Sequence, residues 1–245
     1  MFQRCVRTGE SLLRQSRRNP PIINAPPLVT ALMLMIVAAH AVRVLSGAWL
    51  EGVFIDYGAV FPDRFWAWAG ADIPRAMQPP DGPLQALLPL VGTAFVHGDW
   101  GHLLMNSIFL IALGKPVYEA LQQMSRSARG RDITFLALFF ASVAGGSLAH
   151  IVAYYPSGPP AIGASGGVSG LLAAVLLMQQ KQGGQILERG FLAATGVFVV
   201  ANIALAFFGP QLLGASIAWQ AHLGGYVTGA ILFRLLIARH VRKGA

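Results

Sequence analysis

Long apolar stretches separated by short polar segments run through most of the chain. A membrane-spanning helix needs about 20 consecutive, mostly apolar residues. Six stretches meet that requirement, at about 28–49, 101–121, 133–155, 163–180, 190–208 and 212–237. The pattern therefore predicts an all-α, polytopic membrane protein with six transmembrane helices.

The composition supports this class of protein. Hydrophobic residues make up 55% of the 245 residues and charged residues only 11%, whereas a soluble domain carries about 25% charged residues. The net charge of +8 comes from basic residues next to apolar segments, where they set orientation in the membrane, so no nucleic-acid partner is expected. The single cysteine, Cys5, excludes an internal disulfide.

The charges of the loops alternate from one side of the membrane to the other. The segment 50–96 holds five acidic residues against two arginines, and the segments 156–162 and 209–211 hold no charge. Because Lys and Arg favour the cytoplasmic side, both termini are expected there. Arg43, toward the outer end of the first stretch, does not fit this sorting. The residues assigned to the cytoplasmic side are Arg4, Arg7, Arg14, Arg17, Arg18, Arg126, Arg129, Arg131, Lys181, Arg189, Arg234, Arg239, Arg242 and Lys243.

The expected organisation is a basic cytoplasmic segment at 1–27, a six-span domain at 28–238 and a basic tail at 239–245. The outer loop 50–96 is long and rich in aromatic residues, which prefer the membrane interface, so it is expected to rest there. A bacterial inner (plasma) membrane is the simplest location. Signal-peptide cleavage after the sequence Ala39-His40-Ala41 and a mitochondrial transit peptide are weaker alternatives.

Polar residues inside spans are costly and are therefore candidates for function. They concentrate in the second, fourth and sixth stretches, which all run from the outer side inward if the charge sorting holds. The second begins near His97, Asp99 and His102 and continues to Asn106. The fourth begins with Gly163-Ala164-Ser165-Gly166, and the sixth contains Ala221-His222-Leu223-Gly224-Gly225.

Two pairs of glycines predict close contact between the fourth and sixth stretches. Gly166 and Gly170 form one small-xxx-small pair, and Gly225 and Gly229 form the other. Parallel packing of the pairs would bring Ser165 and His222 to similar depth, and His222 is expected about ten residues, or roughly 15 Å, into its helix. The pairs are used within the chain and predict no dimer.

A serine beside a histidine indicates a hydrolase. A hydroxyl becomes a good nucleophile when a base takes its proton, and His222 suits that role for Ser165. No Asp or Glu lies deep in these stretches, which favours a Ser/His dyad over a triad. His102, Asn106 and the backbone N–H of Ser165 are the candidate donors to the oxyanion. No cofactor or metal is needed, although His97, Asp99 and His102 could also be read as metal ligands.

These motifs resemble the rhomboid family of intramembrane proteases. The resemblance covers about residues 54–229 and rests on His97, His102 and Asn106, on Gly163-Ala164-Ser165-Gly166, and on Ala221-His222 with Gly225 and Gly229. It implies a six-helix rhomboid-like bundle and a Ser165/His222 endopeptidase in which His102 and Asn106 help to hold the oxyanion. The implied partners are membrane-anchored protein substrates, cut in the outer part of the lipid bilayer.

The sequence departs from the family pattern at two places. Many members carry Trp-Arg in the loop before the second span, where this chain has Leu88-Pro89. The residue four positions after the nucleophile is often aromatic in the family and can stack on the catalytic histidine, whereas here it is Ser169. The imidazole of His222 must therefore be held in place by other contacts.

Two other functions remain alternatives. A non-catalytic relative would bind transmembrane clients without cutting them, although it would have no need of both Ser165 and His222. A small transporter would also place polar residues around a central cavity, and its activity would survive the loss of Ser165.

Overall fold

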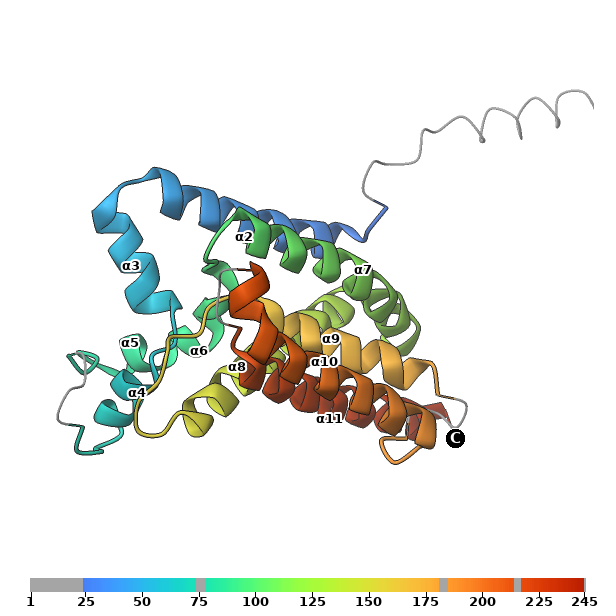
Figure 1. Cartoon of the computed structure of the whole chain (residues 1–245). Helices are drawn as coiled ribbons and strands as arrows, with labels where there is room; N and C mark the ends of the chain where they lie inside the picture. Colours follow the sequence, from blue (N-terminus) through green and yellow to red (C-terminus); the bar gives the residue numbers. More distant parts are fainter. Residues whose placement is uncertain (1–23, 74–77, 181–184, 214–216, 245) are drawn as a thin grey trace, which may run out of the picture.

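The computed structural model describes residues 24–73, 78–180, 185–213 and 217–244. In this part of the chain the regular structure is helical, and the only β-type pairing is an isolated bridge between Val60 and Ala161. Most of the basic segment 1–27, together with Arg75 and Lys181, lies outside the described residues. The helices, shown in Figure 1, are α2 (Pro27–Leu45), α3 (Ala48–Gly58), α4 (Pro62–Trp68), α5 (Pro83–Leu87), α6 (Pro89–Gly92), the 3₁₀ turn η1 (Thr93–Phe95), α7 (Trp100–Met124), α8 (Ala128–Ala153), α9 (Ser165–Met178), α10 (Arg189–Leu213) and α11 (Trp219–Gly244).

Among the described residues, five helices are long and apolar enough to cross a membrane: α2, α7, α8, α10 and α11. The all-α, polytopic fold predicted from the sequence is thereby confirmed. The fourth predicted stretch forms the shorter helix α9, with 14 residues, so the count of six spans stays a prediction. A helix of this length rises about 21 Å, which is less than the hydrocarbon thickness of a bilayer.

Helix α9 lies at the centre of the bundle, where it packs against α7, α8 and α11. Fully buried side chains around it include Phe139 of α8, Leu171 and Leu177 of α9, and Phe233 of α11. The face of α9 toward α11 is lined by glycines, which let the two backbones approach closely. The centre of the bundle thus holds the helix that begins with Ser165.

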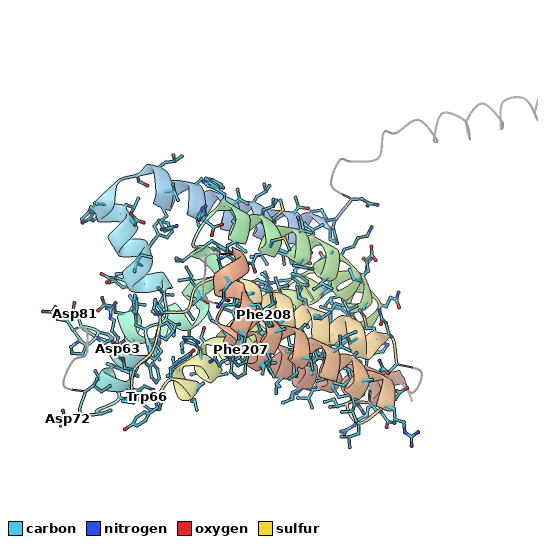
Figure 2. The ribbon with its side chains drawn as sticks, in the orientation of Figure 1. Asp63, Trp66, Asp72, Asp81, Phe207 and Phe208 are labelled. Carbon is cyan, nitrogen blue, oxygen red and sulfur yellow. The ribbon has the colours of Figure 1, made fainter. Side chains whose placement is uncertain are left out.

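The segment between α2 and α7 forms a separate group of short helices at one end of the bundle. Figure 1 shows α3, α4, α5 and α6 gathered there, with the C-terminus at the opposite end. Arg64 of α4 pairs with Asp56 of α3 at 3.0 Å, and the Trp66 indole donates to the carbonyl of Ile151 in α8. Figure 2 shows Asp63, Asp72 and Asp81 at the same end. The acidic loop predicted from the sequence is therefore a folded cap on the bundle.

The boundary between the last two long helices differs from the sequence prediction. Helix α10 continues through Gly209 to Leu213, and α11 begins only at Trp219. The predicted turn at 209–211 was wrong because an apolar pair such as Leu212 and Leu213 can extend either helix, and hydropathy alone does not divide them. His222 consequently lies in the first turn of α11, and the expected position ten residues into the helix is corrected.

Candidate active site

The loop that leads into Ser165 is irregular but firmly held. The His150 side chain contacts the carbonyl of Pro159 at 2.9 Å, and Ala161 exchanges two backbone hydrogen bonds with Val60. The Gly163 N–H donates to the carbonyl of Thr93 at 2.9 Å. The Ala164 N–H donates to His97 Nε2 at 3.4 Å. Irregular backbone is tolerated at membrane depth when its polar groups are satisfied by protein, and these contacts satisfy several of them.

Gly163 gives the turn before α9 its shape. Its φ of 112° lies in the region that side-chain-bearing residues rarely adopt. A β-carbon added there would lie 2.8 Å from His102 Nε2 and 3.8 Å from Ser165 Oγ. The imidazole of His102 and the hydroxyl of Ser165 therefore flank the same small space, which only glycine leaves open.

Ser165 is the first residue of α9, so its backbone N–H points out of the start of the helix. The first α9 residue whose N–H bonds back to the preceding turn is Val168, which donates to Ala164. The N–H groups at a helix start are free donors, and the helix dipole adds positive potential there. The start of α9 can therefore stabilise negative charge that develops beside Ser165.

Glycine contacts bring Ser165 and His222 to the same level of the bundle. A β-carbon on Gly225 would lie 2.8 Å from the Cα of Gly166, and one on Gly229 would lie 2.5 Å from the carbonyl oxygen of Gly170. A β-carbon on Gly166 would lie 3.5 Å from the carbonyl of Ala221. Gly166 and Ala221 are the chain neighbours of Ser165 and His222, so the two helix starts that carry these residues meet.

The chain neighbours of Ser165 and His222 are in contact, but the two side chains are not seen to be hydrogen-bonded to each other. Among the hydrogen bonds of the described residues, none joins Ser165 Oγ to the imidazole. The side-chain bond of His222 runs instead from Nδ1 to Oδ1 of Asn202 in α10, over 2.7 Å. Catalytic hydrogen bonds are often long before substrate binds, so this geometry is compatible with a dyad that tightens on a substrate.

The two candidate site residues of the second span, His102 and Asn106, lie on one face of α7. His102 is in the first turn, and Asn106, which is buried, donates from Nδ2 to the carbonyl of His102 at 3.0 Å. The carboxylate of Asp99 caps α7 by accepting from the His102 N–H at 2.9 Å. That hydrogen bond lowers the pKa of Asp99, so the cap stays ionised. The carboxylate of Asp99 is thus used to cap a helix, which argues against its being a metal ligand. The described residues contain no group of three or more His, Cys, Asp or Glu arranged to hold a metal ion.

Arg43 of the first span, α2, contacts the turn that precedes α7. Arg43 is buried, pairs with Glu51 of α3 at 2.9 Å and donates to the carbonyl of His97 at 2.7 Å. His97, in the turn before α7, is fully buried, and burial lowers its pKa to about 3. A neutral imidazole can accept through Nε2, as the contact with Ala164 requires. Arg43, which did not fit the charge sorting, therefore links α2 and α3 to the turn before Ser165.

Sequence reasoning missed Asn202, Arg43 and the buried role of His97. Asn202 carried a signal, because an amide within an apolar span is expensive unless it is paired. It was overlooked because its helix contains none of the family motifs. The partner of Arg43 could not be read from the sequence, since His97 is 54 positions away.

Comparison with known proteins identifies the family. A family model described as the Rhomboid domain matches residues 85–239. No curated protein matches the chain. The matched segment is more than half of the chain and contains α7, α9 and most of α11, the three helices that meet at Gly163 and at the glycine contacts. The chain is a multi-pass membrane protein that belongs to the rhomboid family.

Proposed function

We propose that this protein is an intramembrane serine endopeptidase that cleaves membrane-anchored proteins. Ser165 is the nucleophile and His222 the general base, and His102, Asn106 and the Ser165 N–H stabilise the oxyanion. The observation that carries the proposal is the convergence of the three motif segments. The starts of α9 and α11 meet through Gly166 and Ala221, and the His102 imidazole flanks the same space as Ser165 Oγ.

The reaction is acyl transfer to serine followed by hydrolysis. Ser165 Oγ attacks the scissile carbonyl while its proton passes to His222 Nε2, and the C–N bond then breaks as the imidazolium returns that proton to the leaving amine. Water, deprotonated by the same nitrogen, then attacks the acyl-enzyme. The bond from the acyl carbon to Ser165 Oγ breaks as the imidazolium returns the proton to that oxygen, and the new carboxyl end is released. Both tetrahedral intermediates place negative charge next to the start of α9 and His102, where fixed donors cost no reorganisation.

The orientation in the membrane follows from the charges. The acidic cap of α3 to α6 lies at the end of the bundle from which α7, α9 and α11 begin, and the C-terminus lies at the opposite end. We propose that the cap is on the outer side of a bacterial inner membrane and the termini are cytoplasmic. Substrates would then be cut in the outer part of the bilayer, and single-span membrane proteins are the substrates of suitable topology.

The test is cleavage of a panel of single-span membrane proteins by purified protein in liposomes. We expect Ser165→Ala and His222→Ala each to reduce the turnover number by at least about 10³-fold, and the double variant to be no worse, because the pair acts as one unit. Ser169→Ala is the matched control, since Ser169 is a buried serine one turn later in the same helix. It should retain activity within about threefold of the wild type.

The alternatives give different results in the same assay. Equal cleavage by wild type and Ser165→Ala would mean that another group, or a contaminant, is the nucleophile. Binding of the panel without cleavage by any variant would identify a non-catalytic relative. Solute uptake that persists in Ser165→Ala would identify a transporter.

A further inference from the structure

His222 is held by a residue outside the family motifs. Asn202 belongs to α10, a helix that turns many of its large apolar side chains outward, including Val197, Val200 and Phe207. Figure 2 shows Phe207 and Phe208 on this helix. Asn202 is only 4% exposed, and its Oδ1 lies 2.7 Å from His222 Nδ1.

A second hydrogen bond fixes the direction of the amide. Asn202 Nδ2 donates to the carbonyl of Phe198 at 2.8 Å. Since that carbonyl only accepts, the nitrogen of the amide must face Phe198 and the oxygen must face the imidazole. Oδ1 has no proton to give, so His222 Nδ1 carries the proton and Nε2 carries the free electron pair.

We propose that Asn202 is the positioning residue of the catalytic histidine, a role that rests on the proposed protease function. It selects the tautomer in which Nε2 can take the proton of Ser165, and it restrains the plane of the ring. Asn202 exchanges no proton itself. When Nε2 receives the serine proton, the imidazolium keeps its Nδ1–H bond to the amide oxygen, and that bond becomes charge-assisted and stronger. The site is then a Ser165–His222–Asn202 triad whose third member comes from α10.

This role explains how His222 can be held although Ser169 replaces the aromatic residue that is common in the family. No aromatic contact among the described residues includes His222, so ring stacking does not hold the imidazole here. Ser169 is buried in α9 and has no ring to offer. The amide of Asn202 instead restrains the imidazole through a directional hydrogen bond to Nδ1. A metal-ligating histidine is oriented in the same way, by the hydrogen bond that its other ring nitrogen makes.

The chain provides a matched control for helix contact alone. Thr195, two turns before Asn202, contacts the hydroxyl of Tyr226 in α11 at 2.7 Å. Thr195→Val removes that hydrogen bond with little change of shape and leaves His222 untouched. Asn202→Leu removes the acceptor with little change of size, and Asn202→Asp keeps an oxygen in the same place.

The first measurement is the rate of substrate cleavage and of Ser165 labelling by a fluorophosphonate, with purified full-length protein in liposomes. We expect Asn202→Leu to lower both rates about 100-fold, largely through the turnover number and not KM, because a misplaced base slows chemistry. Asn202→Asp should recover at least tenfold of that loss, and Thr195→Val should stay within about threefold of the wild type. Equal loss in Asn202→Leu and Thr195→Val would mean that Asn202 only joins two helices, and the proposal would be wrong.

The second measurement reads the tautomer directly and does not depend on protease activity. Nitrogen-15 solid-state NMR of histidine-labelled protein in lipid, with His222 assigned from the His222→Gln spectrum, should show a protonated Nδ1 and a bare Nε2. Asn202→Leu should lose this single tautomer, whereas Thr195→Val should keep it. A protonated Nε2 in the wild type would overturn the proposal. A wild type that has the predicted tautomer but neither cleaves nor labels would instead contradict the proposed function.

Discussion

Helices α9 and α10 both pack against α11, but they do so by different means. Helix α9 meets α11 backbone to backbone, through Gly166 and Gly170 against Gly225 and Gly229. Helix α10 meets α11 through side chains on a single stripe, in which Phe191 and Phe198 stack on the ring of Tyr226. The rest of α10 exposes large apolar side chains.

The difference separates two parts of the proposed catalytic apparatus. Ser165 and the loop before it are fixed by close glycine contacts and by a set of backbone hydrogen bonds. The imidazole of His222 depends on Asn202, which comes from the more loosely packed helix. The proposed nucleophile thus lies in the closely packed part of the bundle, whereas the orientation of the proposed base depends on how α10 packs against α11.

The largest expected effect is on the glycine interface. Gly225→Ala would place a methyl carbon 2.6 Å from the carbonyl carbon of Gly166, and backbone cannot move aside as a flexible side chain can. We expect a loss of about 3 kcal/mol in the free energy of unfolding, at the upper end for overpacking. Denaturant titration of the purified protein, followed by circular dichroism, measures it.

Gly196→Ala in α10 is the control for this prediction. A β-carbon at Gly196 has no neighbour within 4 Å, so the variant should be as stable as the wild type or more stable by up to about 1 kcal/mol, from helix propensity. Similar losses in the two variants would show that the contrast between the two interfaces is not real.

A smaller effect is expected at the turn before Ser165. Gly163→Ala should lower the turnover number about 100-fold, because the methyl group would displace the His102 ring from the space beside Ser165. Gly47→Ala supplies the same kind of backbone strain, with φ of 80° and open space around the residue, at a cost of about 1–2 kcal/mol. Its turnover should match the wild type. If Gly47→Ala is as inactive as Gly163→Ala, strain and not the site explains the loss.

The smallest effect concerns the support from the first span. Arg43→Met should destabilise the protein by about 2 kcal/mol, because the buried carbonyl of His97 loses its donor. Glu51→Gln should cost less than about 1 kcal/mol, since Glu51 is half exposed and surface pairs contribute little. Thermal unfolding of both variants at one lipid composition provides the comparison. A larger loss for Glu51→Gln would mean that the ion pair, and not the bond to His97, is the main contact of Arg43.

Much of the fold was predictable because hydropathy and helix length are local properties. The all-α polytopic class and most helix centres follow from the apolar stretches. The boundary between α10 and α11 could not be predicted in the same way. The segment from Phe207 to Leu213 contains one boundary signal, the pair Gly209-Pro210, and α10 continues through that pair.

The candidate site was predictable to the extent that its residues lie in short motifs. Ser165 and His102 adjoin a glycine, His222 lies two residues before Gly224, and Asn106 lies four residues after His102. Asn202 and Arg43 act through partners 20 and 54 positions away. Those pairings depend on which face an apolar helix turns toward its neighbour, and a helix that is apolar all round gives no periodic signal for that choice.

The stripe that joins α10 to α11 has a consequence for the lipid around the protein. Helix α10 exposes large apolar side chains, which in a bilayer would contact acyl chains, so its tilt is expected to respond to the thickness of the bilayer. A change of tilt moves Asn202 relative to His222, and with it the share of molecules whose histidine is aligned. Turnover would then vary with acyl-chain length even when substrate, temperature and protein are unchanged, so the composition of the membrane would act on this protein much as an effector does.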